Sequence, residues 1–158
     1  QQGLVQDTDN GQPRILPYAC LVPFATGTLK GASKAWPGFP TLCRQLVPEL
    51  PVLLMPGPGP ETIQARTDYP DAQTLAGVPL DVYAALLANS SVVVANDTGP
   101  GHLAAAVGAR LVSVLGPTDA SRYRALGPHV TLIQHHPWPE VDTVLQQVHQ
   151  AIAAARQG

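Results

Sequence analysis

The feature that most constrains the fold is a polar, glycine-containing segment at residues 96–102 that separates two apolar segments. Residues 91–95 are a short run rich in β-branched side chains, which is typical of a buried parallel strand. Residues 103–108 are small and apolar, which favours a helix packed closely against a sheet. The N–H groups at the start of such a helix and its dipole together favour an anion. We therefore expect an anion-binding loop between a strand and a helix.

Strand and helix patterns alternate along most of the chain. The hydrophobic pattern predicts strands at residues 15–24, 51–55, 72–75, 91–95, 111–115 and 130–133. It predicts helices at residues 40–46, 61–65, 80–89, 103–108 and 141–156. This order predicts an α/β domain with a doubly wound parallel sheet, in which ligands bind at the carboxyl ends of the strands.

Length and composition are those of one domain. The chain has 158 residues, enough to bury a core, and its 45% of hydrophobic residues is ordinary for a globular protein. Residues 1–14 are polar and lack periodicity, so we expect an interdomain linker or a frayed terminus there. A single domain is then expected over residues 15–158. Cys20 and Cys43 are far apart in the sequence, which predicts buried thiols in a reducing compartment.

Several classes of function are disfavoured by what the sequence lacks. The net charge is −2 and the only lysines are Lys30 and Lys34, so no basic stripe for nucleic acid is visible. The sequence contains no Gly-x-Gly-x-x-Gly motif and no Walker lysine motif, which counts against nicotinamide dehydrogenases and P-loop enzymes. His135 and His136 have no acidic or thiol partner nearby in the sequence, so we expect surface loop residues and no metal site. No apolar run is long enough to cross a membrane.

Two charged residues near predicted strand ends are candidates for a nucleotide diphosphate site. Lys34 could meet phosphate oxygens as a point charge, or it is a solvated loop lysine. Glu61 could accept hydrogen bonds from ribose hydroxyls, or its charge simply favours the N-terminus of its helix.

The segment at 96–102 supplies the remaining candidates. Gly99 and Gly101 would let a pyrophosphate approach the backbone closely. His102 could donate to a phosphate oxygen, best when protonated, or it is a structural loop histidine. Asp97 or Thr98 is expected to cap the helix. Because a carboxylate beside a pyrophosphate is unfavourable, Asp97 is expected to hold the loop or a sugar hydroxyl.

These residues carry a resemblance to a known family. The run Asn96–Ala106, followed by Leu115–Asp119 with its Gly-Pro-Thr, resembles the signature of the ADP-heptose:lipopolysaccharide heptosyltransferases, glycosyltransferases of family 9 with the GT-B fold. Residues 34–37 resemble the family's Lys-x-Trp-Pro element, and residues 59–61 resemble its acidic turn. The resemblance covers most of the chain, and after residue 130 only the pattern matches.

The resemblance implies a Rossmann-like domain that corresponds to the C-terminal, nucleotide-sugar-binding domain of a GT-B enzyme. The N-terminal acceptor domain, which in this family supplies the general base, is expected to be absent, so we expect the chain alone to be an inactive fragment. The implied function is inverting transfer of heptose from ADP-heptose to the inner core of lipopolysaccharide. The implied location is cytoplasmic, with peripheral contact at the inner membrane of a Gram-negative bacterium.

The resemblance also implies roles for particular residues. Catalytic roles are implied for Lys34, Asp97 and His102. Nucleotide-sugar contacts are implied for Lys34, Glu61, Asp97, Thr98, Gly99, Gly101, His102 and Thr118. A cation, a helix N-terminus and a histidine could stabilise the leaving diphosphate without a metal, so no cofactor is expected. The implied partners are the nucleotide-sugar donor, a lipid A/Kdo-type glycolipid acceptor and the missing N-terminal domain.

Two alternatives keep the fold and change the function. A GT-B domain of this kind could use another nucleotide sugar, because no residue of the sequence identifies the base. It could also be a non-catalytic nucleotide-binding relic. Such a relic would bind a partner or ligand without transferring sugar. Ligand binding by the isolated domain separates it from the two transferases, and donor preference separates the transferases from each other.

Overall fold

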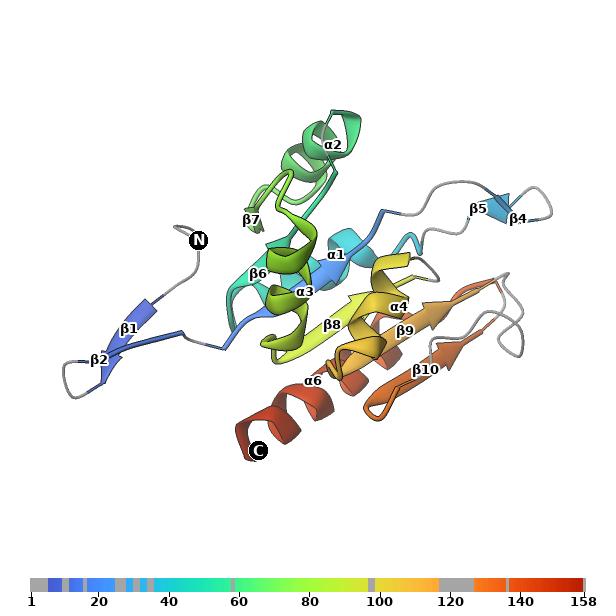
Figure 1. Cartoon of the computed structure of the whole chain (residues 1–158). Coiled ribbons are helices and arrows are strands. Elements are labelled where there is room, and N and C mark those ends of the chain that lie inside the picture. The colour runs from blue at the N-terminus through green and yellow to red at the C-terminus, as the bar shows by residue number, and fades with distance from the viewer. Residues whose placement is uncertain are drawn as a thin grey trace.

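The computed structural model has a six-stranded parallel sheet at its centre (Figure 1). The structure describes residues 6–9, 12–15, 17–24, 28–29, 32–33, 36–57, 59–96, 99–116, 127–135 and 137–157. The strands of the sheet are β3 (Ala19–Val22), β6 (Val52–Leu54), β7 (Gln73–Thr74), β8 (Val92–Ala95), β9 (Leu111–Leu115) and β10 (Val130–Gln134). They lie in the order β10-β9-β8-β3-β6-β7, and every neighbouring pair is parallel.

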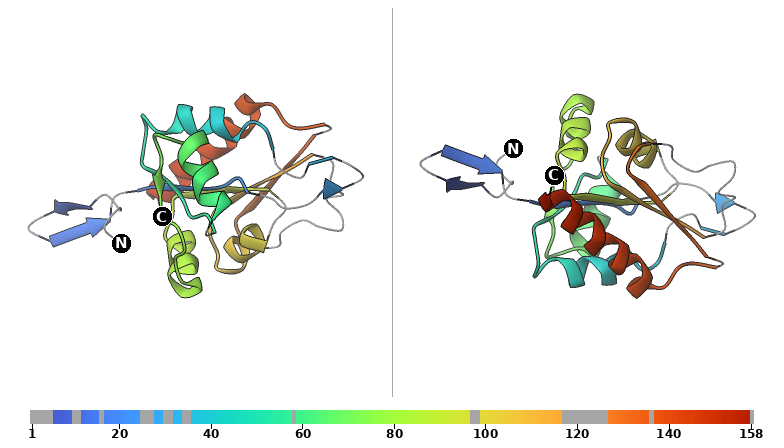
Figure 2. Two further views of the ribbon diagram at one scale, coloured as in Figure 1. Left: turned by 90° about the horizontal axis from the view of Figure 1, so that it is seen from above. Right: turned by 90° about the horizontal axis from the view of Figure 1, so that it is seen from below.

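Helices cover both faces of this sheet. They are α1 (Phe39–Leu46), α2 (Pro60–Asp68), α3 (Leu80–Ala88), α4 (Gly99–Ala106) and α6 (Val141–Gln157). Figure 2 shows α1 and α6 on one face and α3 and α4 on the other. The expected doubly wound, Rossmann-like α/β fold is therefore confirmed.

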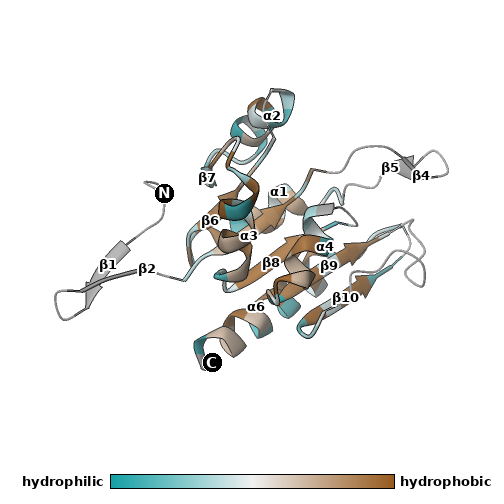
Figure 3. Ribbon diagram, in the orientation of Figure 1, coloured by the Kyte–Doolittle hydropathy of each residue, from teal (hydrophilic) through white to brown (hydrophobic). Residues whose placement is uncertain are grey.

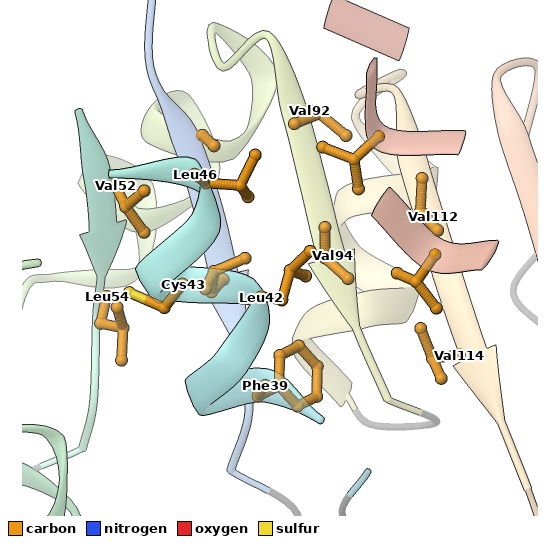
Figure 4. Packing of buried hydrophobic residues seen from close by; sticks show 14 of the residues in the cluster. Phe39, Leu42, Cys43, Leu46, Val52, Leu54, Val92, Val94, Val112 and Val114 are labelled. Carbon is orange, nitrogen blue, oxygen red and sulfur yellow. The ribbon is translucent and has the colours of Figure 1, made fainter. Parts of the chain in front are cut away.

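The central strands are buried on both faces because their side chains alternate in direction. On β3, Ala19 and Leu21 join the core under α1 and α6, while Cys20 and Val22 join the core under α3 and α4. Figure 3 shows the strands as the most hydrophobic part of the ribbon. Figure 4 shows the first core, in which α1 and α6 together cover alternate residues of three strands: Val52, Leu54, Val92, Val94, Val112 and Val114.

The winding direction of the chain reverses between β3 and β8. From β3 the chain proceeds outward through β6 and β7, then returns to β8 and proceeds outward the other way through β9 and β10. β3 and β8 pair in parallel from Ala19↔Val92 to Val22↔Ala95. In open α/β sheets, the crevice at the carboxyl ends of two such strands is where ligands bind.

Element boundaries differ from the sequence expectation in three places. The first strand of the sheet is shorter, Ala19–Val22 instead of 15–24. The helix α2 continues to Asp68 instead of ending at residue 65. The helix α4 begins at Gly99, four residues earlier than expected. Gly99 and Gly101 therefore belong to the first helical turn and not to a separate loop.

Two small antiparallel hairpins accompany the sheet. β1 (Gln6–Asp9) pairs with β2 (Gln12–Ile15) inside the segment expected as a linker or frayed terminus, and Figure 1 shows this hairpin apart from the sheet. β4 (Thr28–Leu29) pairs with β5 (Ala32–Ser33) between β3 and α1. These four strands are short and contain no hydrophobic run, so the hydrophobic pattern did not reveal them. The domain boundary at residue 15 stays a prediction.

Candidate functional site

The candidate site lies at the carboxyl ends of β3 and β8, where the winding of the sheet reverses. The helix α4 follows β8 closely and begins here. Gly101 is buried and His102 is exposed, and both lie in the first turn of α4. The first N–H groups of a helix have no partner within the helix, and the helix dipole gives this end a partial positive charge. This is the geometry that favours an anion, and the sequence motif predicts it.

Glu61 lies in the first turn of α2 and is partly buried. Its Oε1 accepts a hydrogen bond from the Gly57 N–H at 3.1 Å. The hydroxyl of Thr62 donates to the Gly57 carbonyl at 2.8 Å, so two side chains of α2 hold the turn that precedes it. Gly59 completes this turn with a φ of +82°, a conformation that other residues rarely adopt. Glu61 therefore has the place in the first turn of α2 that the structural alternative required, and it also holds the preceding turn through a hydrogen bond that the sequence did not indicate. Its ribose contact stays a prediction.

Four of the expected site residues lie outside the residues that the structure describes: Lys34, Asp97, Thr98 and Thr118. Described residues within two positions of them in sequence include Trp36, Asn96 and Gly116. All three are buried at the carboxyl edge of the sheet or in the segment that enters α1. Among the expected residues that the structure describes, Gly99, Gly101 and His102 come together on α4, and Glu61 lies on α2.

Asn96 is a buried residue of the site that the sequence analysis assigned no role. It follows β8 directly and is 1% exposed. Its Oδ1 accepts a hydrogen bond from the Trp36 N–H at 2.9 Å, and its Nδ2 donates to the Pro23 carbonyl at 3.2 Å. The available signal was an amide placed directly after four apolar strand residues, where a buried polar side chain needs partners.

A second feature that the sequence did not indicate is an apolar pocket of about 390 Å³ between α3 and α4, which Figure 1 shows side by side. Its lining residues are Leu80, Tyr83, Pro100 and Leu103. Burial, with smaller contributions from the nearby Cys20 and Glu61, raises the pKa of Tyr83 to about 12. Tyr83 of α3 therefore lies against Pro100 and Leu103 of α4 in an apolar surrounding.

The remaining sequence expectations concern cysteines, metals and membranes. Cys20 and Cys43 are free and buried, as expected. Within the described ranges, no group of three or more His, Cys, Asp or Glu side chains could hold a metal ion. His135 is exposed, as expected for a surface loop, and His136 lies outside the described residues. None of the helices in the part of the chain that the structure describes has both the length and the apolarity that a membrane crossing requires.

The sequence of the chain matches the family model described as glycosyltransferase family 9 (heptosyltransferase) over residues 1–152. The chain belongs to this family. A comparison with curated protein sequences finds no match.

Solved structures with the same fold include heptosyltransferases from E. coli. The heptosyltransferase WaaC with ADP is 24% identical, with a TM-score of 0.75, over 85% of this chain and 44% of that chain. The ADP-heptose lps heptosyltransferase II is 23% identical, with a TM-score of 0.71, over 89% and 47%. WaaC with ADP-2-deoxy-2-fluoro heptose is 26% identical, with a TM-score of 0.65, over 87% and 42%. This family 9 chain thus spans less than half the length of the solved structures it matches.

Proposed function

We propose that this chain is the donor-binding domain of an inverting glycosyltransferase that transfers heptose from ADP-heptose to the inner core of lipopolysaccharide. One observation carries the proposal: in a chain of family 9, the residues on either side of Asp97 and Thr98 join β8 to α4 where the winding of the sheet reverses. The E. coli relative whose solved structures contain ADP and ADP-2-deoxy-2-fluoro heptose supports an ADP-sugar as the donor.

Some of the assigned residues bind the sugar nucleotide, and others stabilise the charge that develops on the leaving group. Glu61 binds the ribose through its carboxylate, beside the hydrogen bond that it accepts from Gly57. The first turn of α4 binds the diphosphate with Thr98, Gly99 and Gly101, and Thr118 adds a phosphate contact. Asp97 contacts sugar hydroxyls or braces the loop, which keeps its charge off the diphosphate.

The proposed reaction is a single displacement at the anomeric carbon. An oxygen of the acceptor hydroxyl forms a bond to this carbon while the bond from the carbon to the diphosphate oxygen breaks, and the configuration inverts. The electron pair leaves with the nucleoside diphosphate, and the hydroxyl proton goes to a general base outside the residues assigned here. Lys34, His102 and the N-terminus of α4 stabilise the charge that develops on the leaving group, so no metal is required.

The acceptor and the location belong to the same proposal. The acceptor is a lipid A/Kdo-type glycolipid, bound mainly by an N-terminal domain of the kind that completes a GT-B enzyme. Such an acceptor is presented at the cytoplasmic face of the inner membrane, which makes the enzyme a cytoplasmic protein with peripheral membrane contact.

Calorimetric titration of the chain with ADP, UDP and GDP, each with and without magnesium, tests the proposal. We expect selective binding of ADP with the same affinity in both conditions, because the proposed site uses side chains and backbone N–H groups and no metal. Preference for UDP or GDP would contradict the ADP donor and move the chain to another nucleotide sugar. Absence of binding by all three would contradict a donor site formed by this chain alone.

A further inference from the structure

The carboxyl ends of β3 and β8 are tied together by one side chain. The amide of Asn96 donates to the carbonyl of Pro23, the residue that follows β3, and accepts from the N–H of Trp36, which precedes α1. Both bonds are buried, and they join residues that are 73 and 60 positions apart in the sequence. Three segments that meet at the expected ligand crevice are therefore held by a single planar group.

Trp36 is itself held firmly on its other side. Its indole Nε1–H donates to the carbonyl of Pro139, in the connection between β10 and α6, at 3.0 Å. Its ring packs edge-to-face on Phe39 of α1, with ring centroids 5.1 Å apart, and only 3% of the residue is exposed. Because the indole is anchored at Pro139 and Phe39, the bond from its backbone N–H to Asn96 holds the end of β8 against a fixed point.

The two partners of this bond adjoin the expected phosphate-binding residues in the sequence. Asn96 directly precedes Asp97 and Thr98, and Trp36 follows Lys34 by two residues. We infer that Asn96 is a positioning residue of the donor site, which holds the end of β8 that leads in sequence to Asp97 and Thr98 at a fixed separation from Trp36, the residue two positions after Lys34. This inference rests on the proposed function, because the residues that Asn96 would position are the ones that the proposed function assigns to the donor site.

The chemistry of the side chain explains why an amide is needed. A carboxylate in its place keeps an acceptor for the Trp36 N–H but brings a second oxygen against the Pro23 carbonyl. An aliphatic side chain leaves both backbone groups buried without partners, which is unfavourable because neither regains the hydrogen bond that it makes with water in the unfolded chain. Only the amide of Asn96 offers the acceptor and the donor together at this length of side chain.

The test compares Asn96→Asp with a matched control at the other end of the same strand. Ser90, next to the amino end of β8, is buried and donates to the Leu87 carbonyl at 2.8 Å, so Ser90→Ala also removes a buried hydrogen bond. For both variants we measure calorimetric affinities for ADP and for adenosine, together with backbone amide shifts by NMR. We expect Asn96→Asp to lower ADP affinity roughly tenfold or more while adenosine affinity changes little, because the diphosphate residues move apart. We expect Ser90→Ala to leave both affinities unchanged.

The NMR chemical shifts of the backbone amides test the inference in the absence of any ligand. We expect Asn96→Asp to shift the amides of residues 34–36 and of residues 97–99 together, and Ser90→Ala to shift neither set. If the wild-type chain binds ADP but Asn96→Asp loses no more affinity than Ser90→Ala, the positioning role is wrong and the proposed function stands. If the wild-type chain binds no nucleotide, the proposed function is wrong. In that case, shifts of both sets of amides in Asn96→Asp would still support the coupling between the two segments, and a shift of only one set would contradict it. Should Asn96→Asp not fold, Asn96→Ser is measured with the same outcomes.

Discussion

Glu61 shows at the scale of one residue how a structural role and a binding role share a carboxylate. Its Oε1 accepts from the Gly57 N–H, so the first turn of α2 and the turn before it are joined through this oxygen. A carboxylate has a second oxygen and further lone pairs, which leaves acceptor capacity for ribose hydroxyls. The sequence offered ribose binding and a favourable charge at the helix N-terminus as alternatives for Glu61, and its place in the first turn of α2 permits both at once.

Substituting Glu61 separates the two roles. We expect Glu61→Ala to weaken ADP binding roughly tenfold, because a charge-assisted hydrogen bond to the ribose is lost. Binding of 2′-deoxy-ADP is expected to fall less, since that ligand lacks the 2′-hydroxyl. Calorimetry with both nucleotides measures the difference. An equal fall for the two ligands would show that Glu61 only holds the turn or contacts the 3′-hydroxyl.

His102 tests the phosphate end of the site. It is exposed and lies in the first turn of α4, so its substitution should leave the fold intact. We expect His102→Ala to weaken ADP binding several-fold and to leave adenosine binding nearly unchanged, because only ADP places a diphosphate at this turn. Titration of the variant with both ligands is the measurement. Equal losses would remove His102 from the phosphate site.

The two cysteines make stability depend on alkaline pH. Burial raises the pKa of the Cys43 thiol from 9.0 to about 11 and that of the Cys20 thiol from 9.0 to about 12. Because the folded pKa lies above the unfolded value, this contribution to stability is complete below pH 9.0 and is lost as the pH rises toward 11 and 12. We expect the free energy of unfolding to fall across this range. In denaturant titrations, the double variant Cys20→Ala/Cys43→Ala should show a smaller fall, and an unchanged fall would contradict the assignment.

At the scale of the element, the connection between β10 and α6 closes over the end of β9. Gly116 follows β9, and a Cβ at this position would overlap the Pro137 carbonyl oxygen and lie 2.6 Å from the Trp138 ring. Pro139 in the same connection accepts the hydrogen bond from the indole of Trp36. A segment in which the sequence showed no motif thus packs against Gly116 and Trp36 at the edge of the site.

Gly116→Ala is expected to destabilise the protein by about 1–3 kcal/mol, because backbone and ring must move to admit the methyl group. Gly57→Ala is the matched control, since a Cβ there would meet nothing nearer than Glu61 Oε1, at an ordinary 3.5 Å. Denaturant unfolding of both variants gives the comparison. If Gly116→Ala were as stable as Gly57→Ala, the close packing of the 137–139 connection would be refuted.

The sequence predicted most accurately the elements whose hydrophobic runs have clear ends. The strand at 111–115 was predicted with its observed bounds, and the strand at β8 within one residue, because both are β-branched runs bounded by polar or glycine residues. The early start of α4 was missed because Gly99-Pro100-Gly101 has poor intrinsic helix propensity. The first turn of a helix tolerates proline and glycine, since its N–H groups need no partner within the helix.

At the scale of the whole molecule, ligand binding should couple to unfolding of the domain. Saturation with ADP at about 100 times its dissociation constant is expected to add about 2.7 kcal/mol to the free energy of unfolding. For a domain of this size, that corresponds to a rise in Tm of roughly 5–10 °C. Differential scanning fluorimetry with ADP, and with adenosine as control, measures it. An equal rise with adenosine would contradict a site that recognises the diphosphate.

The sequence by itself determined the fold class and the family. The evidence for both is local: strands that are apolar on both faces, their alternation with helices, and one glycine-containing segment between a strand and a helix. Local features can be recognised from the order of residues along the chain. The resemblance carried by residues 34–37, 59–61 and 96–106 led to family 9, which the family match over residues 1–152 confirms.

Only the tertiary structure decided how the site is held together. The bonds from Asn96 to Trp36 and Pro23, and from Trp36 to Pro139, join residues 60 to 103 positions apart. The order of the strands brings these residues to one edge of the sheet, and no periodicity along the chain encodes which of them will meet. A buried amide must find partners, but the sequence does not say where they lie; the packed sheet does.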